Sequence, residues 1–189
     1  MKKIGIYGGT FDPIHHGHLI LAREAREKLE LDQIIFVPAA ASPLKEPPSA
    51  SATLRLEMLQ AAIKGQEGFV FDDCEIQRPA PSYSIDTALQ FREREPKAQL
   101  FWLIGADNAS SLNKWHRVEE LKQLVQFAIL DRGCSELKQQ IYPVVQRNID
   151  ISATDIRNRV ASGRSIRYLV PQTVEEIIRR EKLYRESTT

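Results

Sequence analysis

The sequence predicts a single α/β domain built on a doubly wound parallel sheet, and three observations support this fold class. Short apolar runs alternate with amphipathic stretches along the chain, which is the order of a parallel sheet whose strands are connected by helices. Two of the runs are continuously apolar, as expected for strands that helices cover on both faces. The length of 189 residues, 42% of them hydrophobic and 27% charged, fits one globular domain over residues 1–189.

Six apolar runs are predicted to be strands, and each has a helical pattern before or after it. They are residues 4–7, 34–37, 69–71, 100–104, 127–130 and 149–151. The runs at 100–104 and 127–130 are the two continuous ones, so these strands are expected in the middle of the sheet.

The helices are predicted from the spacing of apolar residues and from residues typical of helix ends. The first is expected over residues 17–29, where one face carries Leu19, Ala22, Ala25 and Leu29. Further helices are expected over residues 53–64, from 84 onward, 118–124, 152–160 and from 171 onward. Pro171 suits the first turn of the last helix because a first-turn N–H has no intrahelical partner. Residues 38–51 show no period and are expected to form a long loop, a kind of segment that is often functional.

Composition and charge exclude several classes of protein. The formal net charge is +1 and no basic tract could follow a nucleic-acid backbone, so a nucleic-acid partner is not expected. Cys74 and Cys134 are far apart and outside any CxxC pair, which argues against a zinc site or a disulfide framework and fits a reducing compartment. No segment resembles a signal peptide or approaches the roughly 18 apolar residues that span a bilayer. We therefore expect a cytoplasmic protein without a membrane partner; its oligomeric state stays open, with a homo-oligomer as one alternative.

The sharpest motif lies between the first predicted strand and the first predicted helix. It reads Gly8-Gly9-Thr10-Phe11-Asp12-Pro13-Ile14-His15-His16-Gly17-His18. Two glycines after a strand permit a tight turn and a close approach of backbone N–H groups to a ligand, and the amino terminus of the next helix attracts anions. The motif therefore predicts a phosphate site.

His15 and His18 stand three residues apart, and Gly17 between them removes a side chain where a triphosphate would pass close to the backbone. An imidazole donates to a phosphoryl oxygen in either protonation state, because the neutral ring keeps one N–H. Two other interpretations stay open: a tight turn with ordinary hydrogen-bonded histidines, and a metal site formed by His15, His16 and His18. The metal site is disfavoured because no Cys, Asp or Glu with ligand spacing follows closely.

A second candidate phosphate site follows residue 151. Ser152 and Asp155 have the spacing of a capping box, and a cap worth about 1 kcal/mol explains the pattern by itself, with Arg157 as a solvated side chain. The functional interpretation places the hydroxyls of Ser152 and Thr154 at a second helix amino terminus, with Arg157 one turn later to bind phosphate. The two interpretations are compatible. Binding at the carboxyl ends of a doubly wound sheet predicts that both motifs reach one triphosphate.

The first motif resembles the GGTFDPxHxGH motif of the HxGH nucleotidyltransferases, an α/β superfamily with a Rossmann-like fold. The resemblance implies that His15 and His18 are catalytic residues, which stabilise charge on the phosphates of ATP during nucleotidyl transfer. It also implies an ATP-binding role for Gly8, Gly9, Thr10 and Gly17. The second motif resembles the ISSTxIR motif of the same superfamily, with Ala153 in place of a more common serine. This resemblance implies ATP contacts for Ser152, Thr154 and Arg157.

Three further segments resemble the bacterial nicotinate-mononucleotide adenylyltransferases, so that the similarity extends over nearly the whole chain. They are residues 81–87, residues 105–107 leading on to Trp115, and residues 170–171 with the closing helix. The resemblance implies that backbone amides around Tyr83 and Ser84 hold a pyridine carboxylate, that Trp115 stacks on the ring, and that Asp107 belongs to the same site. Trp115 has a second interpretation, in which it covers the core beside a helix.

Two basic residues are implied to hold the phosphate of the mononucleotide. Lys45 occupies a basic position of the family's long loop, although Leu44 before it replaces the usual histidine. Arg132 matches an arginine position after the fifth strand, and its alternative interpretation is a loop arginine exposed to water.

These features predict an adenylyltransferase that transfers AMP from ATP to nicotinate mononucleotide, giving deamido-NAD and pyrophosphate in NAD biosynthesis. Mg²⁺ is expected to arrive with ATP rather than at a protein site. No general base is required, because the attacking 5′-phosphate has a second pKa of about 6 and is mostly dianionic at neutral pH. Two alternatives remain: a phosphopantetheine adenylyltransferase, which usually has threonine at the position of His15, and a nucleotide-binding sensor without turnover. The sequence leaves open the choice between nicotinate and nicotinamide mononucleotide and the protonation states of His15 and His18.

Overall fold

The computed structural model describes residues 1–40, 47–79, 81–133 and 141–185. Within these ranges, six strands form one parallel sheet in the order β3-β2-β1-β4-β5-β6. The strands are β1 (Lys3–Gly9), β2 (Gln33–Pro38), β3 (Phe69–Phe71), β4 (Gln99–Gly105), β5 (Gln126–Asp131) and β6 (Val144–Gln146). The strand order reverses between β1 and β4, and doubly wound sheets bind ligands outside the carboxyl ends of the strands at such a point.

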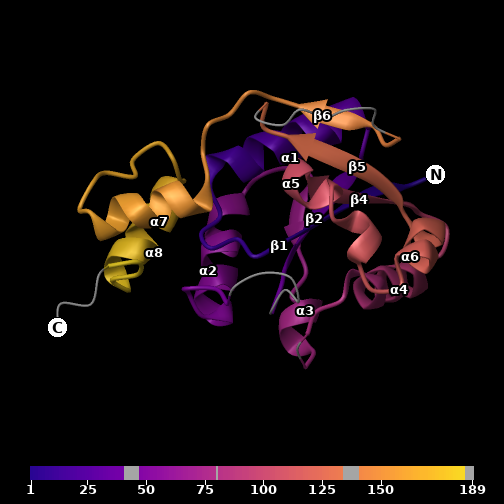
Figure 1. Cartoon of the computed structure of the whole chain (residues 1–189), viewed down its shortest axis with the longest axis horizontal. Helices are drawn as coiled ribbons and strands as arrows, with labels where there is room; N and C mark the ends of the chain where they lie inside the picture. Colours follow the sequence, from indigo (N-terminus) through magenta and orange to yellow (C-terminus); the bar gives the residue numbers. More distant parts are fainter. Residues whose placement is uncertain (41–46, 80, 134–140, 186–189) are drawn as a thin grey trace.

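Helices cover both faces of the sheet, as the doubly wound fold class predicts (Figure 1). One face packs against α1 (His16–Lys28) and α2 (Ala52–Ile63), and α8 (Gln172–Arg180) packs on α2. Buried residues of α7 (Ala153–Ala161) and α8 belong to the same apolar cluster. The other face packs against α3 (Cys74–Gln77), α4 (Ser84–Arg94), α5 (Ala106–Ala109), the 3₁₀ turn η1 (Leu112–Lys114) and α6 (Val118–Leu124). Figure 1 shows α7 and α8 together at one end of the molecule and α4 and α6 at the other.

The two apolar clusters follow from the alternation of side chains along each strand. In β4, Leu100, Trp102 and Ile104 enter the cluster beneath α4 and α6, whereas Phe101 and Leu103 enter the cluster beneath α1 and α2. All five side chains are buried, because both faces of this central strand are covered. Burial on both faces of β4 therefore explains the continuous apolar run at 100–104, as predicted.

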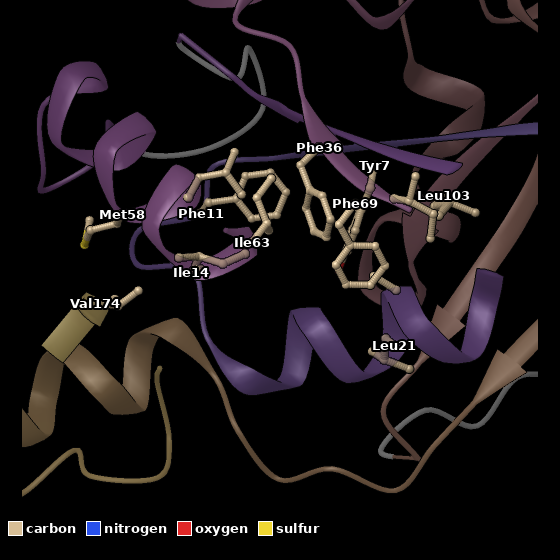
Figure 2. Close-up of a cluster of buried hydrophobic side chains, with 14 of the residues drawn as sticks. Tyr7, Phe11, Ile14, Leu21, Phe36, Met58, Ile63, Phe69, Leu103 and Val174 are labelled. Atoms are coloured by element: carbon tan, nitrogen blue, oxygen red, sulfur yellow. The ribbon is translucent and has the colours of Figure 1, made fainter. Parts of the chain in front are cut away.

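The loop after β1 is anchored in the larger cluster by an aromatic residue. Phe11 lies in a group of rings with Tyr7 and Phe36, at centroid distances of 5.5 Å and 5.8 Å (Figure 2). A Cβ at Gly9 would lie 2.8 Å from the Phe11 ring, so the glycine is needed to admit it. Phe11 has a φ of 49°, a left-handed conformation that is uncommon for an aromatic residue. Gly9, the last residue of β1, thus allows a turn whose shape is fixed by the core.

Three details differ from the sequence predictions. The sixth strand is β6 (Val144–Gln146), and the prediction of a strand at 149–151 is wrong: β5 ends at Asp131, so those residues have no strand beside them to extend the sheet. The strand over 127–130 lies second from the edge rather than in the middle, although it is paired on both sides. Pro171 is the residue before α8 rather than in its first turn.

In the described part of the chain, no helix is both long and apolar enough to cross a membrane.

Candidate active site

The carboxyl ends of the strands lie along one edge of the sheet, and the candidate site occupies the middle of that edge. β1 ends at Gly9, in register with Pro38 of β2, and β4 ends at Gly105, in register with Leu130 of β5. The chain turns from β1 into α1 at this edge, so the first motif lies where a doubly wound sheet binds its ligand.

The two predicted phosphate motifs meet at this edge. Nη1 of Arg157 donates a 2.8 Å hydrogen bond to the backbone carbonyl of Asp12, and Nη2 donates a 3.3 Å bond to Oγ1 of Thr154. The N–H of His16 also donates to the carbonyl of Leu169 at 2.9 Å, so the segment after α7 contacts the start of α1. The prediction that the two motifs lie together is therefore confirmed, although 145 residues separate Asp12 from Arg157.

His15 and His18 form a reciprocal cap at the amino terminus of α1. His15 is the N-cap residue, and its Nδ1 accepts the backbone N–H of His18 at 3.3 Å. Nδ1 of His18 accepts the backbone N–H of His15 at the same distance. The two rings are stacked with centroids 3.7 Å apart and planes 21° from parallel. Imidazoles thus perform the capping role that a serine and a glutamate have in the usual capping box.

This cap fixes which ring nitrogen carries the proton. A nitrogen that accepts a hydrogen bond carries no proton itself, so the neutral form of either ring bears its proton on Nε2. Burial, followed by the nearby positive charges of Arg132 and His16, lowers the pKa of His15 to about 3. His15 is only 2% exposed and is therefore neutral at physiological pH. The sequence had left this protonation state open.

Gly17 packs closely against the first histidine and lies beside the start of the second motif. A Cβ at this position would lie 3.0 Å from Nδ1 of His15 and 3.4 Å from the carbonyl oxygen of Ile151. The first of these contacts is tighter than ordinary van der Waals contact, so a side chain would displace the imidazole from its capping position. The sequence analysis explained Gly17 by the space that a triphosphate needs. The structure shows a second reason, which is the close packing of the His15 imidazole.

The second motif begins a helix as the capping interpretation predicted. Ser152 is the N-cap residue of α7, and its Oγ accepts the backbone N–H of Asp155 at 3.1 Å. Nη1 of Arg132 donates a 2.9 Å bond to the carbonyl of Ile151, immediately before the cap. Arg132 is also close enough to His15 for its charge to lower the pKa of that histidine. Its contact with the mononucleotide phosphate stays a prediction.

A cavity of about 670 Å³ opens beside the turn that follows β1. Its lining includes seven residues that the sequence had assigned to substrate binding: Gly8, Gly9, Thr10, Tyr83, Ser84, Asp107 and Trp115. It also includes Glu75, Trp102, Asn108, Lys114 and His116, which the sequence had not singled out. Since Gly8 to Thr10 belong both to the cavity and to the phosphate motif, the two halves of the site share one turn. A cavity of this size fits a mononucleotide-sized ligand.

Aromatic rings form one wall of the cavity. The rings of Tyr83 and His116 lie 4.5 Å apart at 36°. Trp115 follows η1 and is partly exposed, with its edge contact to Phe127 at 6.4 Å on the core side. The alternative that Trp115 only covers the core is therefore incomplete, because the same side chain lines the cavity.

The amino terminus of α4 lies at the cavity. Tyr83 is its N-cap residue and makes no side-chain capping bond within the described residues. The first N–H groups of a helix have no intrahelical acceptor, and the helix dipole makes this end attractive to an anion. Glu75 lines the same cavity, and burial raises its pKa despite a 2.7 Å hydrogen bond from Thr87.

Three residues around the phosphate turn were missed by sequence reasoning: Asp12, Arg55 and Tyr184. Asp12 and Arg55 are 5% and 1% exposed. A signal existed for Arg55, since its spacing from Met58, Leu59 and Ala62 places it on the buried face of α2. No local pattern connects Tyr184 to the turn. Lys45 and Leu44 lie outside the described residues.

Comparisons with known proteins identify the family of the chain. The cytidylyltransferase-like family model matches residues 6–159. A protein of Exiguobacterium sibiricum, named a probable nicotinate-nucleotide adenylyltransferase, is 42% identical over 96% of this chain and 98% of its own length. A protein of the same name from Methylacidiphilum infernorum is 43% identical over 96% of this chain and 92% of its own length. The structure of Plasmodium falciparum nicotinic acid mononucleotide adenylyltransferase complexed with NaAD has a TM-score of 0.82 at 20% identity, over 97% of this chain and 98% of that one, which shows a shared fold.

Proposed function

Since the chain belongs to the cytidylyltransferase-like family, we propose that it is an adenylyltransferase that joins the AMP part of ATP to nicotinate mononucleotide, releasing pyrophosphate. The contact between Arg157 and Asp12 carries the proposal, because it brings a guanidinium to the turn that bears the two histidines. The cavity for the second substrate begins at the same turn.

The ATP tail lies between the two helix amino termini in this proposal. The Nε2–H groups of His15 and His18 donate to phosphoryl oxygens, where charge increases as pyrophosphate departs. Arg157 and the hydroxyls of Ser152 and Thr154 hold the outer phosphates. The backbone of Gly8, Gly9 and Thr10, together with Gly17, lets the phosphates lie close to the chain.

The nucleophile is the 5′-phosphate of the mononucleotide, which attacks the α-phosphorus while the bond to pyrophosphate breaks. This phosphate is mostly dianionic at neutral pH, so the chain needs no general base and acts by alignment and charge stabilisation. Mg²⁺ enters as part of the MgATP substrate. Within the described ranges no group of three or more His, Cys, Asp or Glu residues has metal-site geometry.

The mononucleotide occupies the cavity beneath Trp115. Its pyridine ring stacks on Trp115, and its carboxylate accepts N–H groups at the amino terminus of α4, near Tyr83 and Ser84. Asp107 lines the same cavity. Lys45 and Arg132 remain the proposed partners of the mononucleotide phosphate.

Pyrophosphate release from MgATP tests the proposal when nicotinate mononucleotide, nicotinamide mononucleotide and phosphopantetheine are compared. We expect turnover with nicotinate mononucleotide, and about a 10²-fold loss of kcat in His18→Ala, the scale for removing one transition-state donor. A preference for phosphopantetheine would overturn the substrate assignment. Absence of turnover with all three would favour a nucleotide-binding sensor.

The acid-over-amide preference has a test of its own at Ser84, the first residue of α4. Proline is tolerated at this helical position and removes only the N–H, and Tyr83 before it already has the extended backbone that proline favours. We expect Ser84→Pro to lower kcat/KM for nicotinate mononucleotide about tenfold or more, the scale for a hydrogen bond to a charged group. The matched control Ser84→Ala keeps the N–H and should stay within twofold. Equal effects of the two variants would contradict the role of this amide.

A further inference from the structure

Asp12 is a buried junction between four parts of the chain. Its Oδ2 accepts the backbone N–H of Ser49 at 2.7 Å, and its Oδ1 accepts the backbone N–H of Ala50 at 3.2 Å and the hydroxyl of Tyr184 at 2.6 Å. Its backbone carbonyl accepts Nη1 of Arg157 at 2.8 Å. The same residue thus connects the phosphate turn, the segment before α2, the carboxyl-terminal turn and the arginine of the second motif.

Arg55 completes the frame around this junction. Its Nη1 donates to the carbonyls of Thr10 at 2.7 Å and Ala39 at 2.8 Å, and its Nε donates to the carbonyl of Ala50 at 3.3 Å. Burial lowers the pKa of this guanidinium, and the charge of Asp12 opposes that effect. A buried cation that is bonded mainly to backbone carbonyls fixes the path of the backbone. Here it fixes the phosphate turn at Thr10, the end of β2 at Ala39 and the segment before α2 at Ala50.

Tyr184 is brought to Asp12 by an unusual end to α8. Lys182 and Tyr184 have φ values of 55° and 60°, a left-handed conformation that few non-glycine residues adopt. The N–H of Leu183 bonds back to Ile178 at 3.0 Å, which closes this turn. Arg180, one turn earlier, pairs with Glu57 of α2 at 2.8 Å and anchors α8 beside Arg55's helix. The hydrogen bond from the Tyr184 hydroxyl to the buried Asp12 carboxylate compensates the conformational cost of the two left-handed residues.

We infer that Tyr184 is a positioning residue of the ATP site: its hydroxyl orients Asp12, and Asp12 in turn sets the phosphate turn against Arg157. The carboxyl-terminal turn is therefore part of the nucleotide-binding apparatus rather than only a cover for α2. This inference rests on the proposed function for the identity of the ligand, which is ATP. It assigns Tyr184 no contact with substrate.

Tyr184→Phe tests the inference because it removes one hydroxyl and keeps the ring. ATP binding is measured by calorimetric titration of the full chain with MgATP alone, and KM is measured for both substrates, at a temperature below both melting transitions. We expect ATP affinity to fall about tenfold and KM for ATP to rise in parallel, while KM for the mononucleotide stays within twofold. Tyr168→Phe is the matched control, since Tyr168 also has a left-handed φ of 67° but is 77% exposed, and it should behave as the wild type.

The outcomes separate the inference from the proposed function. An unchanged ATP affinity in Tyr184→Phe, with only a lower melting temperature, would overturn the inference and leave the proposed function intact. An equal rise of KM for both substrates would also overturn it, because general loosening rather than positioning would explain the result. Weakened ATP binding in a wild-type background that shows no turnover with any mononucleotide would support the inference and overturn the proposed function. No ATP binding by the wild type would overturn both.

Discussion

The two nitrogens of His15 have different tasks in this account, and two substitutions separate them. Asn places an amide oxygen near the position of Nδ1 and can keep the cap on α1, but it is too short to supply the outer N–H. Gln places an amide N–H near the position of Nε2 and gives up the cap. We predict that His15→Asn is more stable than His15→Ala, because it keeps the cap, but that it loses turnover, whereas His15→Gln loses the cap and keeps turnover.

The magnitudes follow from the contacts of the ring. Losing the 3.3 Å cap to the N–H of His18 should cost about 1 kcal/mol, which lowers the melting temperature of a chain of this size by about 2–4 °C. Losing the Nε2 donor should lower kcat by about 10²- to 10³-fold, or about 3–4 kcal/mol of transition-state stabilisation. His15→Ala, which loses both, serves as the reference for each measurement.

Thermal melts and pyrophosphate release from MgATP, performed on the same preparations, measure the two effects independently. The reasoning fails if His15→Asn retains turnover within threefold of the wild type, because the outer nitrogen would then have no catalytic role. It also fails if His15→Gln is no more active than His15→Ala.

Three further predictions concern the same site. Burial holds the pKa of His15 at about 3 in the folded chain, below the ordinary 6.5, so the imidazole of the unfolded chain is protonated first as the pH falls. The contribution of neutral His15 to the free energy of unfolding is therefore complete above pH 6.5 and is lost as the pH falls toward 3. Between pH 6.5 and 3, the free energy of unfolding measured in urea should fall faster for the wild type than for His15→Asn, by up to about 1.4 kcal/mol per pH unit. The same pH dependence in both proteins would contradict the lowered pKa of His15. Trp115→Ala should raise KM for nicotinate mononucleotide about tenfold, the scale for losing a base stack, and leave KM for ATP within twofold; steady-state kinetics showing the opposite pattern would move the pyridine ring elsewhere. Gly17→Ala should change the free energy of unfolding by less than about 1 kcal/mol, since greater helix propensity offsets the contact with His15, yet lower kcat about 10²-fold; full activity would show that the imidazole tolerates displacement.

The fold was largely readable from sequence because its main elements have strong local patterns. The apolar runs of β1, β2, β4 and β5 and the amphipathic spacing of α1 identify a parallel sheet without tertiary information. β6 could not be placed in this way, because a strand of three residues after Pro143 is defined by its pairing with β5 rather than by its own composition. The short helices α3 and α5, of four residues each, are likewise too short to show a period.

In the candidate site, too, some residues could be predicted from local sequence patterns and others only from tertiary contacts. His15, His18 and Ser152 were accessible because helix capping and phosphate binding depend on neighbours within one turn. Asp12 belongs to the motif that sequence analysis quoted, but its partners come from residues 49–50, 157 and 184, and only the folded chain brings them together. The protonation state of His15 required the same information, since burial in the folded chain is the largest cause of the shift in its pKa.

A double-mutant cycle between His18→Ala and Arg157→Ala tests the central claim most directly, with kcat/KM for MgATP as the measured quantity. Groups that act on one triphosphate depend on each other, so we predict that the double variant loses much less activity than the product of the two single losses. Losses that multiply independently would show that the histidines and the arginine act on different parts of the reaction, and would contradict a shared ATP tail.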